Sequence, residues 1–551
     1  MLPSVKREER NGGGRILHFR PALFFAVFLS LGILFAYLFS VENISRWWLL
    51  AVAIPVLTAV LLSKDKFAAC KRVLFVGIAF LWGTVSFGLQ ISAYTDCPNF
   101  DGEYAVAGRV WQKERGELQD EIVLTDISVN GKSYRGKMTV YLPRATADAL
   151  AYADEVECVA RVKTTADLVG TYVFRAETVA DGVRFRAQDV RDWKVTGNRF
   201  SIGDFLRQTV TETVRENMDE TPAAVTLALL LGDTSGIEQG LLENVRKGGI
   251  AHVFAVSGLH VGALFAVCLG LVERTKLKLL PKWARFTMLS VTLTLYGSVC
   301  GFSASIIRAV VMCLVFYAHR LVGWKADRLE TLGFAAIAVL VCFPCLLFAT
   351  GFQLSFLSCL GIVLLSRRIS DGVFALCNLF DRKEKPVKDP LKADVPPPTL
   401  GEKVKTAVVG TVSVTLSAGL ATAPTLLYSF GYVSLAGVFL NLLFVPLVSV
   451  LFGSFAALVL LSCMFSTLAG VLLYVPNVVV STFLLPFETL TFVGSLSGFT
   501  FGTETAIAYF CALFACSDKL HLTKGQRVAL AVLLFACVLF AFIAGNVCSF
   551  P

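Results

Sequence analysis

The sequence predicts a polytopic α-helical membrane protein with about 11 to 13 spans and an inserted extracytoplasmic β-barrel domain. Three observations predict this class. Of the 551 residues, 55% are hydrophobic and only 17% are charged, whereas about a quarter of a soluble chain is charged. Apolar stretches of about 20 residues, long enough to cross a bilayer, recur along the chain. A single polar stretch, 95–200, interrupts them. This composition excludes a cytosolic enzyme, a disordered scaffold and a conventional secreted protein.

Residues 1–94 contain three apolar stretches, near 21–40, 47–63 and 72–93. The first is too long for a signal-peptide core and lacks a small-residue cleavage site, so we expect it to remain as a helix. Lys and Arg are frequent before the first stretch and between the second and third, but sparse between the first and second. By the positive-inside rule, the N-terminus lies in the cytoplasm and the following domain lies outside.

Residues 95–200 are expected to form the external β domain. Apolar and polar residues alternate with period two, which predicts strands at 103–111, 121–129, 134–142, 155–163 and 172–179. Asn130–Gly131 is typical of a two-residue hairpin turn. Five or more short strands in about 100 residues indicate a small barrel or sandwich, and an OB-like barrel is one member of that class.

Two of the 15 cysteines, Cys97 and Cys158, lie in this external domain. A single cysteine pair in a domain outside the cytoplasm favours a disulfide between them. The alternative is two free thiols in the domain core, because a reduced cysteine commonly packs as a small apolar residue.

The charge of this domain does not indicate a nucleic-acid partner by itself. Residues 95–200 carry 15 basic and 17 acidic side chains, a net charge of −2, whereas a polyanion binder needs local basic density. Some aromatic residues could stack bases, although aromatic side chains in small barrels more often belong to the core: they are Trp111, Tyr134, Tyr141 and Trp193. Basic residues cluster only at the end of the domain: Arg184, Arg186, Arg191, Lys194 and Arg199.

Residues 201–248 are expected to form an amphipathic or re-entrant segment before the channel helices of 249–551. Apolar residues of 202–218 recur near one helical face, which predicts a helix that lies on the outer leaflet or packs against the barrel. Later spans are expected near 250–272, 286–302, 304–322, 329–349, 351–366, 406–428, 435–461, 466–485, 503–516 and 528–548. The charged loop 367–405 is expected in the cytoplasm.

Polar and ionisable residues interrupt apolar runs at several places after residue 228. One stretch reads Ala228-Leu-Leu-Leu-Gly-Asp233-Thr-Ser-Gly236, and another reads His252-Val-Phe-Ala-Val-Ser257-Gly-Leu-His260. Such residues at membrane depth are costly and are functional candidates, and the glycines beside them permit broken helices. The candidates for the path are Asp233, His252, Ser257, His260, Arg308, Gln353, Ser355 and Asn441.

These motifs resemble those of the ComEC-type competence family, the membrane channels of natural transformation. In that family a GD-S-G segment leads into H-x-x-x-x-S-G-x-H, and later elements are similar to Gly301-Phe-Ser-Ala-Ser-Ile-Ile-Arg308 and Gly351-Phe-Gln-Leu-Ser355-Phe. The order of the elements matches from about residue 21 to the last span. The resemblance implies an OB-like domain ahead of channel helices. One departure is Ala304, where many relatives have a proline.

A second departure concerns a nuclease. Many relatives carry a C-terminal metallo-β-lactamase-like domain, which needs an H-x-H-x-D-H ligand cluster. The histidines here are His18, His252, His260, His319 and His521, so the sequence contains no such cluster. We therefore expect a variant without that domain.

Asp233, Ser257 and His260 also suggest a hydrolase triad. Ser257 is not in a G-x-S-x-G elbow, because Ala255 occupies the first glycine position, and Ser and His commonly join membrane helices by hydrogen bonds. A metal site built from His252, His260 and Asp233 lacks a compact ligand motif. We expect no enzyme activity, no metal and no cofactor. Arg308 remains open between a phosphate contact and a structural partner of Asp233.

The expected function is movement of single-stranded DNA across the bacterial cytoplasmic (inner) membrane during natural transformation, by a multi-pass protein with a cytoplasmic N-terminus. The partners are single-stranded DNA and the lipid bilayer. The resemblance adds a DNA receptor, a cytoplasmic ATP-driven motor and a separate nuclease. The alternatives are a secondary transporter of a small solute, although we find no inverted repeat, and a membrane-embedded hydrolase that uses Ser257 and His260.

Overall fold

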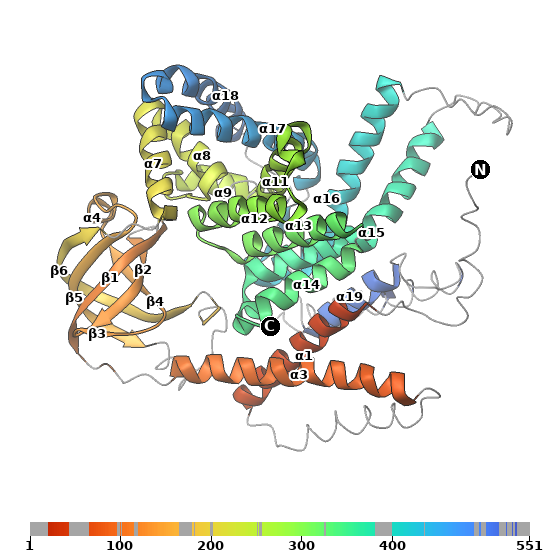
Figure 1. The fold of residues 1–551 in the computed structure, drawn as a ribbon, viewed down its shortest axis with the longest axis horizontal. Helices are drawn as coiled ribbons and strands as arrows, with labels where there is room; N and C mark the ends of the chain where they lie inside the picture. Colours follow the sequence, from red (N-terminus) through yellow and green to blue (C-terminus); the bar gives the residue numbers. More distant parts are fainter. Residues whose placement is uncertain are drawn as a thin grey trace. The chain divides into compact units, whose positions relative to one another are not determined.

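The structure is a computed structural model, and it describes most of the chain. The residues described are 20–42, 66–95, 100, 102–114, 119–164, 179–180, 182–198, 202–250, 252, 256–323, 327–380, 399–434, 436–489, 495–497, 503–516, 525, 532 and 535–536. They belong to two compact units, whose elements are drawn in Figure 1. The larger unit comprises residues 21–353 and 445–492, and the smaller unit includes residues 354–444 and 493–551.

The β domain of the larger unit is a closed five-strand barrel with one short hairpin extension. Its strands are β1 (Glu103–Glu114), β2 (Asp120–Val129), β3 (Lys132–Ser133), β4 (Lys137–Leu142), β5 (Asp154–Thr164) and β6 (Val183–Asn198). The order around the barrel is β1-β5-β6-β4-β2, and a further pairing of β1 with β2 closes it. All neighbours are antiparallel except β4 and β6, which are parallel.

The predicted hairpin turn is confirmed between β2 and β3. Asn130 has φ 49° and Gly131 has φ 77°, which is the left-handed geometry of a tight two-residue hairpin turn. The sequence analysis did not anticipate the long strand β6, which contains most of the basic cluster. The strand expected at 172–179 falls almost entirely outside the described residues.

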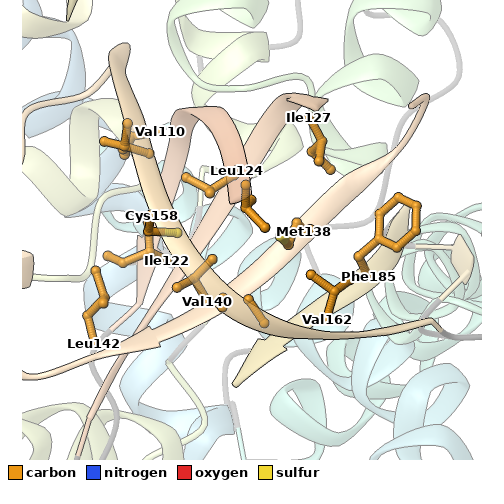
Figure 2. Close-up of a cluster of buried hydrophobic side chains, with 14 of the residues drawn as sticks. Val110, Ile122, Leu124, Ile127, Met138, Val140, Leu142, Cys158, Val162 and Phe185 are labelled. Carbon is orange, nitrogen blue, oxygen red and sulfur yellow. The ribbon is translucent and has the colours of Figure 1, made fainter. Parts of the chain in front are cut away.

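The barrel core is formed by the inward-facing half of each strand. Burial alternates along β5 with period two, as it must where one face of a strand is covered. The larger core side chains that are completely buried are Ile122, Leu124, Ile127, Met138, Val140, Val162 and Phe185. Figure 2 shows them converging from several strands, with Cys158 among them.

Cys158 is a free, buried thiol, and burial raises the pKa of this thiol to about 11. Its predicted partner, Cys97, lies outside the described residues. The predicted Cys97–Cys158 disulfide is therefore not supported, and the packing of Cys158 among apolar side chains agrees with the alternative of a core thiol.

The first helices pack through glycines. In α1 (Pro21–Glu42) and α3 (Lys66–Thr95), a Cβ on Gly32 would collide with the backbone oxygen of Phe80, and a Cβ on Gly83 with that of Leu29. Glycine therefore lets the two backbones cross closely, as is common between membrane helices. The Glu330 side chain of α14 (Arg328–Leu340) accepts a hydrogen bond from the Ala22 amide (2.9 Å) at the start of α1.

The remaining elements of the larger unit follow the barrel. They are α7 (Ile202–Asn217), α8 (Glu220–Leu231), α9 (Gln239–Lys247), α11 (Gly258–Arg274), η1 (Lys276–Leu279), α12 (Lys282–Val299), α13 (Ala304–Val322), α14, η2 (Pro344–Phe348), the part of α17 (Gly437–Met464) from Val445 onward, η3 (Ser466–Leu468) and α18 (Ala469–Thr489).

Helix α7 is amphipathic, and it contacts both the barrel and the helices. Arg109 of β1 forms an ion pair with Asp204 of α7 (3.1 Å), and Gly203 of α7 lies directly against Ser298 of α12. Val214 is fully buried, whereas Ile202 and Phe205 are 73% and 59% exposed. The C-terminal half of the apolar face is thus covered by protein, while its N-terminal end remains exposed.

The smaller unit contains α15 (Thr350–Phe380) from Leu354 onward, α16 (Leu400–Phe430), β7 (Tyr432–Ser434), the start of α17, β8 (Ser495–Ser497) and α19 (Thr503–Cys516). Gly361 of α15 lies against the backbone oxygen of Ser417 in α16. The Tyr509 hydroxyl of α19 donates to the Leu420 oxygen (2.7 Å). Strands β7 and β8 pair antiparallel.

Five helices in the described part of the chain are long and apolar enough to cross a membrane: Pro21–Leu38, Val73–Ser92, Ser305–Val322, Thr350–Leu376 and Gly401–Phe430. Together with the barrel they make this a polytopic helical membrane protein with a β-barrel domain. The spans expected near 47–63 and 528–548 fall largely outside the described residues. The first part of the segment expected as a loop from residue 367 is helical, because α15 continues to Phe380.

Candidate functional site

Ser257 and His260 form a compact turn at the start of α11. Ser257 is the N-cap residue, and its hydroxyl accepts a hydrogen bond from the Leu259 amide (3.3 Å). In return, Nδ1 of His260 accepts a hydrogen bond from the Ser257 amide (3.0 Å). This is a capping box in which histidine takes the place usually held by Glu or Gln. Because Nδ1 accepts a hydrogen bond, the neutral ring carries its proton on Nε2.

The other nitrogen of His260 is buried and has no hydrogen-bond partner among the described residues. His260 is completely buried, its Nε2 is unpaired in that part of the chain, and its ring centroid lies 4.8 Å from that of Phe452 in α17. Leaving a buried donor without a partner costs about 1–3 kcal/mol. A buried polar atom without a partner is an exception in native proteins and calls for an explanation, and a ligand is one such explanation.

Arg308 brings a positive charge to the same turn. It lies in the second turn of α13, is only 6% exposed and has buried apolar neighbours at Ile306 and Ala309. A Cβ on Gly258 would lie 2.8 Å from Nη2 of Arg308, so the guanidinium packs against the first residue of α11. The N-terminus of a helix carries partial positive charge. Arg308 and the helix end therefore both contribute positive electrostatic potential to this turn.

Asp233 belongs to a different cluster, at the junction of the barrel and the helices. Its Oδ2 accepts a hydrogen bond from the Tyr152 hydroxyl (2.7 Å), and its Oδ1 accepts from the hydroxyl (2.6 Å) and the amide (3.1 Å) of Ser235. The Arg207 guanidinium of α7 lies 4.1 Å from the centroid of the Tyr152 ring. Asp233 and Tyr152 are both buried.

The electrostatics of this cluster hold Asp233 ionised. Burial alone raises the pKa of Asp233, which lies outside the five candidate spans. The hydrogen bonds from Ser235 and Tyr152 and the charge of Arg207 together outweigh burial, and the pKa falls below its ordinary value. Burial and the neighbouring Asp233 raise the pKa of the Tyr152 hydroxyl, so Tyr152 remains a donor.

The two clusters are adjacent through the backbone. Gly232 ends α8 in the left-handed conformation (φ 75°), which turns the chain so that Asp233 meets Tyr152. A Cβ on Gly232 would lie 3.1 Å from Cγ2 of Val256, the residue before Ser257. Even so, no hydrogen bond joins Asp233 to Ser257 or His260 among the described residues. The arrangement is therefore not that of a Ser-His-Asp triad.

A cavity of about 530 Å³ lies beside Asp233, between the barrel and helices α7 and α8. Charges of both signs line it, from Lys113, Asp120, Glu212, Arg215 and Glu220 as well as Asp233. The Lys113 ammonium already donates to the backbone oxygens of Ala147 and Leu150. This mixed lining does not favour one class of ligand.

The other predicted residues do not belong to this turn. His252, between α9 and α11, lies close enough to His260 for the two rings to interact electrostatically, and the Gln353 side chain donates to the Leu347 oxygen (3.2 Å). Ser355 and Asn441 belong to the smaller unit; Asn441 is 8% exposed, and its Oδ1 has no hydrogen-bond partner in the described part of the chain. The structure thus brings together Ser257, His260 and Arg308.

The sequence analysis missed Tyr152 and Arg207. Tyr152 lies between the short helix α4 (Arg144–Asp148) and β5, in a turn with no periodic pattern, and it meets Asp233 81 residues later. Only knowledge of the closed barrel could have paired them. Within the described residues, no group of three or more His, Cys, Asp or Glu side chains could hold a metal ion.

Fold and site together define a polytopic helical membrane protein with a barrel domain and a buried cationic turn at a helix start. The family model described as Competence protein matches residues 229–516, more than half of the chain, and that match contains Asp233, Ser257, His260 and Arg308. The chain belongs to the Competence protein family.

Two curated relatives are similar over part of the chain. ComE operon protein 3 of Bacillus subtilis (strain 168) is 29% identical over 259 residues, which are 47% of this chain and 29% of that protein. An uncharacterized protein of Aquifex aeolicus (strain VF5) is 29% identical over 174 residues, which are 31% of this chain and 40% of that protein. The chain thus spans less than half the length of either relative. No solved structure matches it.

Proposed function

We propose that this protein moves single-stranded DNA across the bacterial cytoplasmic membrane during natural transformation, with its N-terminus in the cytoplasm. The observation that carries the proposal is the site at Ser257, His260 and Arg308, which lies inside the region matched by the competence family. A cation and a buried N–H donor at a helix start suit the passage of phosphate groups. Family membership supports a role in DNA uptake.

The hydrogen-bond donors at this site determine which contacts with DNA we expect. The Arg308 guanidinium and the Nε2–H of His260 would donate to phosphate oxygens, since both are donors near the start of α11. These groups would bind any sequence, because phosphate contacts carry no base information. Ser257 and the imidazole Nδ1 would hold the turn in shape through the capping box.

The barrel supports an OB-fold assignment within this proposal. Its strands follow the order β1-β2-β4-β6-β5 back to β1, with a parallel β4–β6 pair and the helix α4 between β4 and β5. An OB fold is a five-stranded Greek-key barrel that commonly binds oligonucleotides. Because the net charge of residues 95–200 is −2, we expect such binding to depend more on stacking than on overall charge.

The test is internalisation of end-labelled DNA in a competent host whose copy of this gene is deleted. Restoring the chain should move label into the nuclease-protected fraction, and Arg308→Ala should reduce this fraction about tenfold or more, as expected for loss of a charge-assisted contact. Arg320→Ala is the matched control, because Arg320 lies at the other end of α13 in an ion pair with Glu273. Uptake that is unchanged by deletion would refute the proposal.

One observation favours a second candidate, a membrane-embedded hydrolase. The Ser257 hydroxyl oxygen lies 3.2 Å from Nδ1 of His260, the distance expected between a nucleophile and its base. We propose that the chain is not an enzyme, because that Nδ1 also accepts the Ser257 amide hydrogen bond. Covalent labelling of Ser257 by a fluorophosphonate probe, lost in Ser257→Ala, would overturn this view.

A further inference from the structure

We propose that Phe302, together with Trp111, forms a stacking platform for the bases of single-stranded nucleic acid at the junction of the barrel and the helices. This inference rests on the proposed function and adds a contact with the bases to a site that otherwise contacts phosphate. It is carried by the backbone conformation of Phe302, by its exposure and by its neighbours in the turn between α12 and α13.

Phe302 is held in a conformation that bulky residues rarely adopt. Its φ is 49° and that of the preceding Gly301 is 80°, so two successive residues lie in the left-handed region. Glycine or asparagine is the usual residue at such a position, and a bulky residue there is a genuine outlier. Strain of this kind concentrates at ligand-binding sites. The ring does not offset the strain by becoming buried, because Phe302 remains 41% exposed.

The surrounding residues fix the direction of the ring. A Cβ on Gly297 would lie 2.8 Å from Cε1 of Phe302, so one edge of the ring occupies the space that a side chain at residue 297 would fill. The Phe302 amide also donates to the Gly297 oxygen (2.9 Å). The aromatic side chain is therefore positioned rigidly against the end of α12 while much of its surface stays accessible.

Trp111 of the barrel meets the same turn. A Cβ on Gly301 would lie 3.7 Å from Cζ2 of Trp111, so the indole is in van der Waals reach of the residue that precedes Phe302. The Lys137 ammonium lies 6.0 Å from the centroid of the Trp111 ring. Aromatic rings beside a cation are the usual composition of single-strand binding sites, where bases stack and the cation attracts the phosphates.

The platform and the buried site are joined by the first turns of α13. Phe302 and Arg308 are six residues apart: Phe302 lies in the turn that meets the barrel, and Arg308 packs against Gly258 at the start of α11. A strand whose base stacks at the turn would have its phosphates close to the cationic turn. An exposed aromatic ring near a membrane can instead lie among lipid headgroups, and the experiment below separates these two environments.

The test compares two fluorescein-labelled strands of equal length, oligo(dT) and an abasic oligomer that keeps the phosphates but lacks the bases. Fluorescence anisotropy measures their binding to the full chain in nanodiscs. We expect wild type to bind oligo(dT) more tightly. Phe302→Ala should weaken oligo(dT) binding about tenfold and leave the abasic oligomer unchanged, because stacking on an aromatic ring contributes to binding through the base alone. Phe302→Tyr should retain the preference.

Two further variants keep the result interpretable. Phe302→Gly removes the ring and also relieves the left-handed strain, so it should unfold at the same or a higher temperature than wild type while losing the preference for bases. Phe343→Ala is the matched control: Phe343 is a 51% exposed aromatic at the end of α14, with an ordinary φ of −134°, and its removal should change neither affinity.

The outcomes distinguish this inference from the proposed function. If wild type binds neither strand, the proposed function fails. If wild type prefers oligo(dT) and Phe302→Ala keeps that preference, the platform is refuted while the proposed function stands. A loss of affinity in Phe302→Ala that is equal for both strands also refutes stacking. Unchanged affinities for both strands would mean that Phe302 contacts lipid headgroups and not bases.

Discussion

Two buried polar clusters lie next to each other in the larger unit, and they differ in how completely their atoms are paired. In one, both oxygens of Asp233 accept hydrogen bonds, from Tyr152 and Ser235. In the other, His260 is buried completely and its Nε2 lacks a partner among the described residues. A fully paired network stabilises a fixed geometry, whereas an unpaired buried donor costs stability until a ligand binds it. We therefore expect the first cluster to act in stability, and we keep the second as the candidate binding site.

The largest expected effect is on stability, from breaking the paired cluster. Asp233→Ala leaves the Tyr152 and Ser235 hydroxyls buried without their acceptor, and we expect the free energy of unfolding of the larger unit to fall by about 3 kcal/mol. Urea unfolding in detergent, followed by Trp fluorescence, measures this change. Tyr152→Phe removes one hydrogen bond and should cost less, about 1–2 kcal/mol.

Glu243→Ala is the control for this prediction. Glu243 is an exposed carboxylate that pairs with Lys247 one turn along α9, so its loss should leave the unfolding curve unchanged. If Asp233→Ala unfolded like wild type but abolished DNA uptake, Asp233 would belong to the DNA path and the contrast between the clusters would disappear.

The second prediction separates the two roles of His260. His260→Ala removes the capping acceptor and should cost about 1 kcal/mol of stability, whereas His260→Glu restores an acceptor at the same position of the capping box. Neither variant has an N–H donor in place of Nε2–H, because an ionised carboxylate only accepts hydrogen bonds. We therefore expect His260→Glu to be more stable to heat than His260→Ala and still to reduce the protected DNA fraction. Normal uptake by the glutamate variant would make His260 a purely structural residue.

A third, smaller effect comes from displacing Arg308 without altering it. In Gly258→Ala the new Cβ would lie 2.8 Å from Nη2 of Arg308, so the flexible guanidinium must move away from the start of α11. We expect the protein level to stay constant and uptake to fall severalfold. Gly262→Ala on the same helix is the control, because nothing lies within 4 Å of its added Cβ. Equal uptake by both variants would contradict the placement of Arg308 in the site.

The smallest effect is a dependence of stability on pH. The pKa of Asp233 is lower in the folded protein than its ordinary value, so its contribution is present above the unfolded pKa of about 3.9 and is lost as pH falls through the folded pKa. Wild type should therefore lose stability below about pH 4 more steeply than Asp233→Asn. Parallel acid-unfolding curves for the two proteins would mean that Asp233 is not held in its charged form.

Sequence patterns predicted the parts of the molecule that depend on neighbouring residues. Alternation along 155–163 predicted β5, and Asn130–Gly131 predicted the hairpin turn between β2 and β3. The motif around Ser257 and His260 also marked a local structure, since both residues belong to one helix cap. Pairings across long separations could not be predicted in the same way. Tyr152 and Asp233 meet only because the barrel closes beside α7 and α8. A local sequence pattern does not predict which distant residues this closure brings into contact.

The closing strand of the barrel also sets the order in which this domain can fold. The strands β5, β1, β2 and β4 pair with one another in that order, and among the described strands it is β6 that joins β5 to β4. Until residues 183–198 have been synthesised, the domain is therefore an open sheet with two unpaired edges, the state in which β proteins aggregate most readily. Closure of the barrel depends on contacts between distant parts of the chain, and such contacts form slowly. A nascent chain halted before Val183 would therefore expose the edges of β5 and β4 together.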